Sequence, residues 1–81
     1  MKQVIFEESA LEDLQYWAKT DIKLLKRIIE LLNAIDKNPF DGIGKPEILK
    51  HDLKGYWSRR ISHEHRLVYK ITDSAIIVIA W

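Results

Sequence analysis

The sequence contains no cysteine, which excludes disulfide bonds and metal sites built from thiolates. It also lacks a long hydrophobic run, since no apolar stretch approaches the roughly 18 residues that a membrane span requires. The short apolar run near the N-terminus is interrupted at once by acidic residues, unlike the core of a secretory signal. These absences predict a soluble, cytoplasmic protein that does not associate with a membrane.

Glycine and proline are scarce, with three and two residues, and most of them lie in one segment. Residues 38–46, NPFDGIGKP, contain both prolines and two of the glycines, which predicts a loop. The two glycines do not belong to a strand–GxxxxGK[ST]–helix unit. The loop is therefore not of the kind that cradles nucleotide phosphates in P-loop enzymes.

The remaining composition is typical of a folded domain. The 81 residues are 47% hydrophobic and 31% charged, and the sequence has no internal repeat or low-complexity run. A chain of this length is expected to form one domain, residues 1–81, with a small core and modest stability.

The N-terminal half predicts a strand followed by two helices. Lys2–Phe6 is short, apolar and rich in β-branched residues, as strands are. Ser9 begins a capping-box pattern, so a helix of about ten residues is expected to start there. A second apolar stripe at three- and four-residue spacing predicts a longer amphipathic helix, capped by Thr20 or Asp21. This helix should end near Asn38, because the next residue is proline.

The C-terminal half predicts four short strands separated by turns. The last strand is apolar along its whole length, so it should be central in the sheet or covered on both faces. Helices followed by strands indicate an α+β fold in the order β-α-α-β-β-β-β, with a helix hairpin packed on a mostly antiparallel sheet. The four expected strands are residues 48–53, 56–62, 65–72 and 75–80.

Alternation along the strands separates a face that contacts the helices from an open face. It places Trp57 and Arg59 on one side of their strand and Arg60 on the other. In the next strand it turns Arg66 away from the more apolar side. The open, concave face of the sheet is therefore expected to carry Arg60 and Arg66.

The net charge of +1 conceals a basic segment. Residues 1–44 carry six Lys or Arg and eight Asp or Glu, a charge of −2, while residues 45–66 carry six and three, a charge of +3. Residues 67–81 carry one of each, so the three regions sum to +1. A local basic surface suits phosphate binding, although a solvated, salt-bridged surface would have the same composition.

The basic segment also holds all three histidines and two adjacent aromatic residues. His63 and His65 could share one face of a strand, but no further ligand at suitable spacing supports a metal site. Tyr56 and Trp57 could stack on nucleic-acid bases, although packing in the core or in a dimer is the simpler role for Trp57. The sequence therefore predicts neither a metal nor another cofactor.

Several short motifs follow one another along the chain. They are EES at residues 7–9, YW at 16–17, TD at 20–21, NPF, GKPE and LKH within 38–51, and G-WSRRI--EHRLVY at 55–69. On these motifs the chain resembles toxins of the YoeB (Txe) family, within the RelE/ParE-like group, over essentially its whole length.

The resemblance implies the same fold and a specific activity. Members of the family are toxins of type II toxin–antitoxin systems, and they act as ribosome-dependent endoribonucleases that cut mRNA in the ribosomal A site. The implied partners are a YefM-like antitoxin, the 70S ribosome with its mRNA, and a second copy in a homodimer. Operator DNA would be reached only through the antitoxin, and no cofactor is implied.

Cleavage of this kind uses the ribose 2′-hydroxyl as its nucleophile. It requires a base for that hydroxyl, cations for the charge on the phosphate, and an acid for the leaving oxygen. The resemblance implies that Glu47 is the general base and that Arg66 stabilises the phosphate. Four further residues would contact the RNA: Lys45, Lys50, His51 and Arg60.

The sequence departs from the family pattern at its C-terminal end. The family's last strand is followed by a short tail with a histidine, which would be the general acid, and a tyrosine, and no residue here matches either one. An impaired toxin that still binds the antitoxin and the ribosome is therefore an alternative. A gyrase-directed toxin of the ParE kind is a weaker alternative, because that activity needs no acid–base set such as Glu47 with the downstream arginines.

Overall fold

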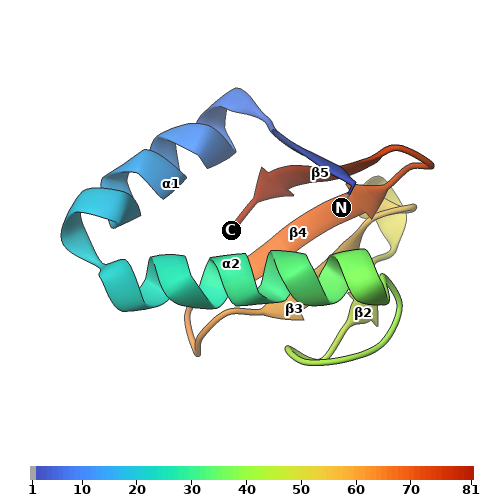
Figure 1. Ribbon diagram of the computed structural model, residues 1–81. Coiled ribbons are helices and arrows are strands. Elements are labelled where there is room, and N and C mark those ends of the chain that lie inside the picture. The colour runs from blue at the N-terminus through green and yellow to red at the C-terminus, as the bar shows by residue number, and fades with distance from the viewer. Residues whose placement is uncertain (1) are drawn as a thin grey trace.

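The computed structural model describes residues 2–81 (Figure 1). A strand is followed by two helices and then by four strands, which confirms the predicted α+β fold and its order of elements. The elements are β1 (Gln3–Phe6), α1 (Glu8–Thr20), α2 (Ile22–Lys37), β2 (Glu47–Ile48), a 3₁₀ turn (His51–Leu53), β3 (Trp57–Arg60), β4 (Arg66–Ile71) and β5 (Ala75–Ala80).

The strands form one five-stranded sheet in the order β1-β5-β4-β3-β2. β1 pairs with β5 in parallel, and the other three pairings are antiparallel, so the sheet is mostly antiparallel as expected. β5 lies between β1 and β4, and its Ile76 and Val78 are fully buried. The prediction of an internal position for this apolar strand is therefore confirmed.

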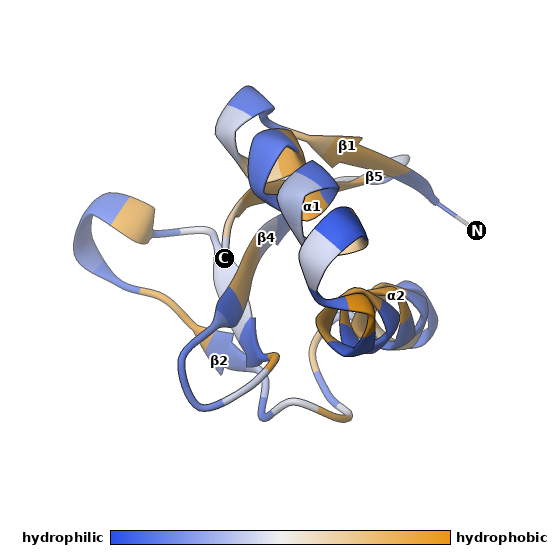
Figure 2. Ribbon diagram, turned by 90° about the vertical axis from the view of Figure 1, so that its left-hand side faces the viewer, coloured by the Kyte–Doolittle hydropathy of each residue, from blue (hydrophilic) through white to orange (hydrophobic). Residues whose placement is uncertain are grey.

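Both helices lie on the same side of the sheet, with α2 seen nearly end-on in Figure 2. The apolar stripe of α2 supplies Ile28, Leu31 and Ile35 to the core, where each is almost fully buried. β4 supplies Leu67 and Tyr69 from the opposite side. Over residues 2–81, neither helix has the length and apolarity needed to cross a membrane.

The start of α1 differs from the prediction at Ser9. The cap residue is Glu7, which provides no side-chain cap, and the helix begins at Glu8 and runs for 13 residues. The amide of Glu7 donates to the carbonyl of Val78 at 2.9 Å, so strand pairing continues up to the helix and leaves no room for a separate cap at Ser9. The second cap prediction is confirmed, because the Asp21 carboxylate accepts from the Leu24 amide at 3.1 Å.

The predicted strand over residues 48–53 is wrong. β2 contains only Glu47–Ile48, and the chain then turns through the 3₁₀ segment, with His51 at a φ of 59°. The carbonyls of Lys50 and His51 accept hydrogen bonds from amides three residues later, which closes this turn locally. The connection between β2 and β3 is thus longer than a tight turn.

Gly44 lies at a crowded point of the loop between α2 and β2. Its φ is +82°, and a Cβ added there would lie 2.8 Å from Leu31 Cδ2 and 3.1 Å from the backbone oxygen of Arg60. Gly55 also has a positive φ, of +92°, but nothing lies within 4 Å of the position of its Cβ. Substitutions at these two glycines therefore distinguish the cost of backbone strain, present at both, from the cost of steric overlap, present only at Gly44.

We expect Gly44→Ala to lower the free energy of unfolding by about 2–4 kcal/mol, because left-handed strain adds to overpacking against α2 and β3. The matched change Gly55→Ala should cost only the strain, about 1 kcal/mol. Urea denaturation of the two variants measures both values. Equal losses would show that the loop does not pack as closely as described.

Candidate active site

Glu47 and Arg66 form an ion pair on the open face of the sheet. Arg66 Nη1 lies 2.8 Å from Glu47 Oε2, and the two side chains are 45% and 61% exposed. Glu47 begins β2 and Arg66 begins β4, so the two residues come from strands on either side of β3. A pair this exposed contributes at most about 1 kcal/mol to stability, so it leaves both groups available to a ligand.

Strand register explains why these groups meet. Glu47 is paired with Ser58 across β2 and β3, and Arg60 is paired with Arg66 across β3 and β4. Residues directly opposite each other point to the same face, so all four lie on the face away from the helices. Arg66 Nη1 also lies 3.4 Å from Ser58 Oγ, which is a weak contact. The predicted placement of Arg60 and Arg66 on one face is confirmed.

The other residues predicted to bind RNA divide into two groups. Lys45 and Arg60 line one pocket, together with Arg27 of α2. Lys50 and His51 are exposed in the connection between β2 and β3, and among the described residues their side chains make no hydrogen bond or ion pair. The structure therefore brings Lys45 and Arg60 together and leaves Lys50 and His51 on a separate projecting segment.

A buried arginine holds the loop that leads to Glu47. The Arg59 side chain is fully buried, and its guanidinium donates to the backbone oxygens of Asn38, Asp41 and Ile43. These three acceptors span the first part of the loop between α2 and β2. Asn38 also caps the C-terminus of α2, where the helix dipole favours a cation. Arg59 thus holds the loop from the core side, and no carboxylate within residues 2–81 pairs with it.

Tyr69 completes this arrangement in the core. Its hydroxyl accepts a hydrogen bond from Arg59 Nε at 3.1 Å and donates one to the backbone oxygen of Pro39 at 2.9 Å. Burial raises the pKa of Tyr69, while the hydrogen bond and the charge of Arg59 partly oppose that rise. The phenol is therefore held in its neutral form, which is the form that can donate to Pro39.

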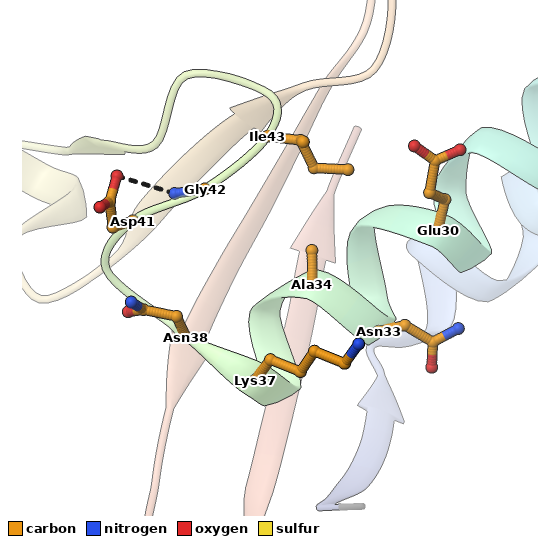
Figure 3. A pocket seen from close by; sticks show the side chains of 8 residues that line it. All are labelled: Glu30, Asn33, Ala34, Lys37, Asn38, Asp41, Gly42 and Ile43. Carbon is orange, nitrogen blue, oxygen red and sulfur yellow. Dashed lines mark hydrogen bonds between the residues drawn. The ribbon is translucent and has the colours of Figure 1, made fainter.

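Another pocket lies away from the ion pair, and neither Glu47 nor Arg66 lines it. It has a volume of about 470 Å³ and lies between α2 and the loop, with Ala34 and Ile43 facing each other across it in Figure 3. Asp41 accepts a local hydrogen bond from the amide of Gly42 at its rim. None of the residues predicted to act on RNA lines it. Within residues 2–81, no three histidine or acidic side chains are grouped to hold a metal ion.

Sequence reasoning missed three contributors to this region. Arg59 was placed on the correct face, but nothing in the local pattern indicated that it binds the loop. Ser58 lies next to Arg66 through strand register alone. Arg27 lines the pocket from α2, a contact that the helical pattern alone does not indicate. Only the tertiary arrangement connects these residues to the site.

The chain is similar to known proteins over nearly its whole length. Residues 6–81 match the family model described as YoeB-like toxin of bacterial type II toxin–antitoxin system. The chain belongs to this family. It is therefore a toxin of a type II toxin–antitoxin system.

Individual YoeB proteins match over nearly the full chain. The YoeB toxin of Synechocystis is 53% identical over 78 residues, which are 96% of this chain and 91% of that protein. The heterotetrameric YoeB–YefM complex from Staphylococcus aureus contains a chain with a TM-score of 0.94 and 48% identity, covering 99% of this chain and 93% of that one. The YoeB dimer from the same organism gives 0.93 and 49%, covering 98% and 92%.

The buried phenol supports a prediction about pH. At neutral pH, Tyr69→Phe should lower the free energy of unfolding by about 1–3 kcal/mol, because Pro39 and Arg59 each lose a hydrogen-bond partner. Above pH ~10 the unfolded chain ionises Tyr69 while the folded chain keeps it protonated, so the wild type loses this advantage as the pH rises. The difference in the free energy of unfolding between wild type and Tyr69→Phe should therefore shrink between about pH 9 and about pH 11, on either side of the ordinary pKa of tyrosine.

Urea titrations at several pH values measure this difference. Tyr16→Phe is the matched control, because the Tyr16 side chain is exposed and its hydroxyl makes no hydrogen bond within residues 2–81. A stability difference for Tyr69→Phe that stays constant through this range would contradict the proposed neutral, buried phenol.

Proposed function

We propose that this toxin is an endoribonuclease that cuts mRNA in the A site of the ribosome and thereby stops translation. The observation that carries the proposal is the exposed pair of Glu47 Oε2 and Arg66 Nη1, 2.8 Å apart on the open face of the sheet. One group accepts a proton and the other binds a phosphate oxygen, so the pair supplies two of the requirements for attack by a ribose hydroxyl.

In the proposed reaction, Glu47 removes the proton of the 2′-hydroxyl as its oxygen attacks the adjacent phosphorus. The bond from phosphorus to the 5′-oxygen breaks, and that oxygen takes up a proton from solvent. The products are a 2′,3′-cyclic phosphate and a 5′-hydroxyl. Arg66 stabilises the charge on the phosphate oxygens, because its planar fork of donors fits two of them at once.

The resting ion pair has a consequence for substrate binding. Arg66 must exchange part of its contact with Glu47 for contacts with the phosphate, which frees the carboxylate to act as a base. This exchange requires little energy, since both side chains are largely solvated and the pair is weak. The hydroxyl of Ser58 lies 3.4 Å from Arg66 Nη1 and offers a second, weak acceptor during the exchange.

The proposed partners follow from the relatives. The Staphylococcus aureus proteins form a YoeB–YefM heterotetramer and a YoeB dimer, which supports a YefM-like antitoxin and a homodimer for this chain as well. The remaining proposed partners are the 70S ribosome and its mRNA. Among the predicted RNA contacts, Arg60 is the best placed, because it is paired directly with Arg66 across β3 and β4.

We expect Glu47→Gln to lower the rate of mRNA cleavage by about 10²–10⁴ while leaving the fold unchanged. The amide keeps the shape of the side chain and a hydrogen-bond acceptor for Arg66, but it cannot take the proton. Primer extension on translating ribosomes measures A-site cleavage, and circular dichroism checks the fold. Wild-type cleavage by a folded Glu47→Gln variant would overturn the assignment of the base.

Glu64→Gln is the matched control for this experiment. Glu64 is exposed in the turn before β4 and carries the same charge. It takes part in no ion pair of the described residues. Its variant should cleave like the wild type, which separates the loss of a base from the loss of one negative charge.

A further inference from the structure

An aromatic cluster on the helix side of the sheet joins α1 to the ends of two strands. The Trp17 ring of α1 meets the His65 ring edge-on, with 5.0 Å between the centroids and 64° between the planes. Trp17 also meets Trp81 edge-on, at 5.5 Å and 72°, and Trp81 lies 6.1 Å from the Phe6 ring. These separations fall within the range of favourable ring pairs, about 4.5–7 Å. The proposed cleavage uses none of these four side chains.

The position of Trp17 is fixed by its surroundings. Its side chain is partly buried and packs against the hydrophobic core. Its carbonyl accepts a hydrogen bond from the amide of Asp21 at 2.8 Å, at the end of α1. The neighbouring Trp81 donates from Nε1 to the carbonyl of Ala10 at 2.8 Å, which ties the residue after β5 to the first part of α1. Trp17 therefore offers His65 a rigid surface.

His65 closes the connection between β3 and β4, residues 61–65. Its carbonyl accepts from the amides of Ile61 and Ser62, at 2.9 and 3.2 Å. Its own amide donates to Ser62 Oγ at 3.3 Å. Within residues 2–81, the imidazole makes no hydrogen bond and no ion pair. The ring therefore acts through its contact with Trp17, whereas the backbone closes the connection.

Arg66 follows His65 directly and is the first residue of β4. The two side chains point to opposite sides of the sheet, because His65 contacts α1 and Arg66 pairs with Glu47 on the open face. That exposed ion pair is too weak to fix Arg66 by itself. The pairing of Arg66 with Arg60 is the last register position between β3 and β4. A displacement of His65 therefore moves the backbone of Arg66 relative to Glu47.

We propose that Trp17 and His65 are positioning residues of the proposed reaction, because their edge-to-face contact sets where β4 begins and thereby holds Arg66 beside Glu47. The inference rests on the proposed function, in which this pair carries the chemistry. Trp17 acts at a distance, since it lies on the side of the sheet that carries the helices. A misplacement of about 1 Å can lower a rate about 10²-fold even when the reacting group itself is intact.

The test measures the rate of A-site cleavage as a function of toxin concentration. We expect His65→Ala and Trp17→Ala each to lower the maximal rate by about 10- to 100-fold. The half-saturating concentration should change little, because neither substitution removes a cation of the open face. His63→Ala and Tyr16→Ala are the matched controls, one in the same connection and one next to Trp17, and both remove exposed side chains. They should cleave like the wild type.

Two further variants distinguish positioning from proton transfer by the imidazole. His65→Phe keeps a ring against Trp17 but cannot carry a proton, so positioning predicts that it recovers most of the rate lost in His65→Ala. The double variant Trp17→Ala/His65→Ala should be about as slow as the slower single variant, because both changes remove the same contact. His65→Leu, which lacks the ring but keeps an apolar side chain, replaces His65→Ala if that variant does not fold.

Three results in folded variants, as checked by circular dichroism, would overturn the proposal. The first is a wild-type maximal rate for the variant that lacks the ring at His65. The second is a His65→Phe variant as slow as that one, which would indicate a direct role of the imidazole. The third is a double variant whose losses simply add, which would show that Trp17 and His65 act independently.

Hydrogen exchange separates a failure of this inference from a failure of the proposed function. The amides of Ile61 and Ser62 donate to His65, so their exchange reports the connection without any RNA. We expect them to exchange about two- to tenfold faster in Trp17→Ala, although that substitution lies on α1. If the wild type cuts no RNA, the proposed function fails and this faster exchange still supports the positioning contact. Unchanged exchange overturns the inference whether or not cleavage occurs.

Discussion

One buried cation, the guanidinium of Arg59, is the constraint on which the site depends. It lies in the core, where no carboxylate of the described part of the chain pairs with it. Its donors are satisfied by three backbone oxygens of one loop and by the hydroxyl of Tyr69. Removing a charge from water costs several kcal/mol unless its hydrogen bonds are replaced. The loop therefore cannot leave the sheet without leaving Arg59 unpaired, and this couples the loop to the core.

This coupling matters because β2 is very short. Glu47 begins a strand of two residues, so pairing with β3 alone fixes it weakly, and the loop before it must supply the rest. β3 serves both purposes through its alternation. Arg59 faces the core and holds the loop, while its neighbours Ser58 and Arg60 face the open side beside Arg66. Core stability and the geometry of the site thus depend on the same four-residue strand.

Sequence patterns predicted the parts of the molecule that repeat regularly. The stripe of α2, the alternation in β3 and β4 and the apolar β5 follow from periodicity, and they placed Arg60 and Arg66 correctly on one face. The incorrect predictions lie where local turn geometry or contacts distant in sequence determine the backbone conformation. The positive φ of His51 ended a predicted strand, and pairing of Glu7 with Val78 displaced a predicted cap. No local pattern could reveal that Arg59 and Tyr69 hydrogen-bond to the loop. The same is true of Arg27 of α2, which lines a pocket together with Lys45 and Arg60.

Hydrogen exchange at the amide of Arg60 tests this account most directly. That amide donates to Gly44, so its exchange rate reports whether the loop is attached to β3. The variant to compare with the wild type is Arg59→Lys, which keeps the charge but lacks the planar fork that reaches several carbonyls at once. The account predicts much faster exchange at Arg60 in the variant, while amides between β4 and β5 remain protected. Unchanged protection of the Arg60 amide in a folded Arg59→Lys protein would contradict it.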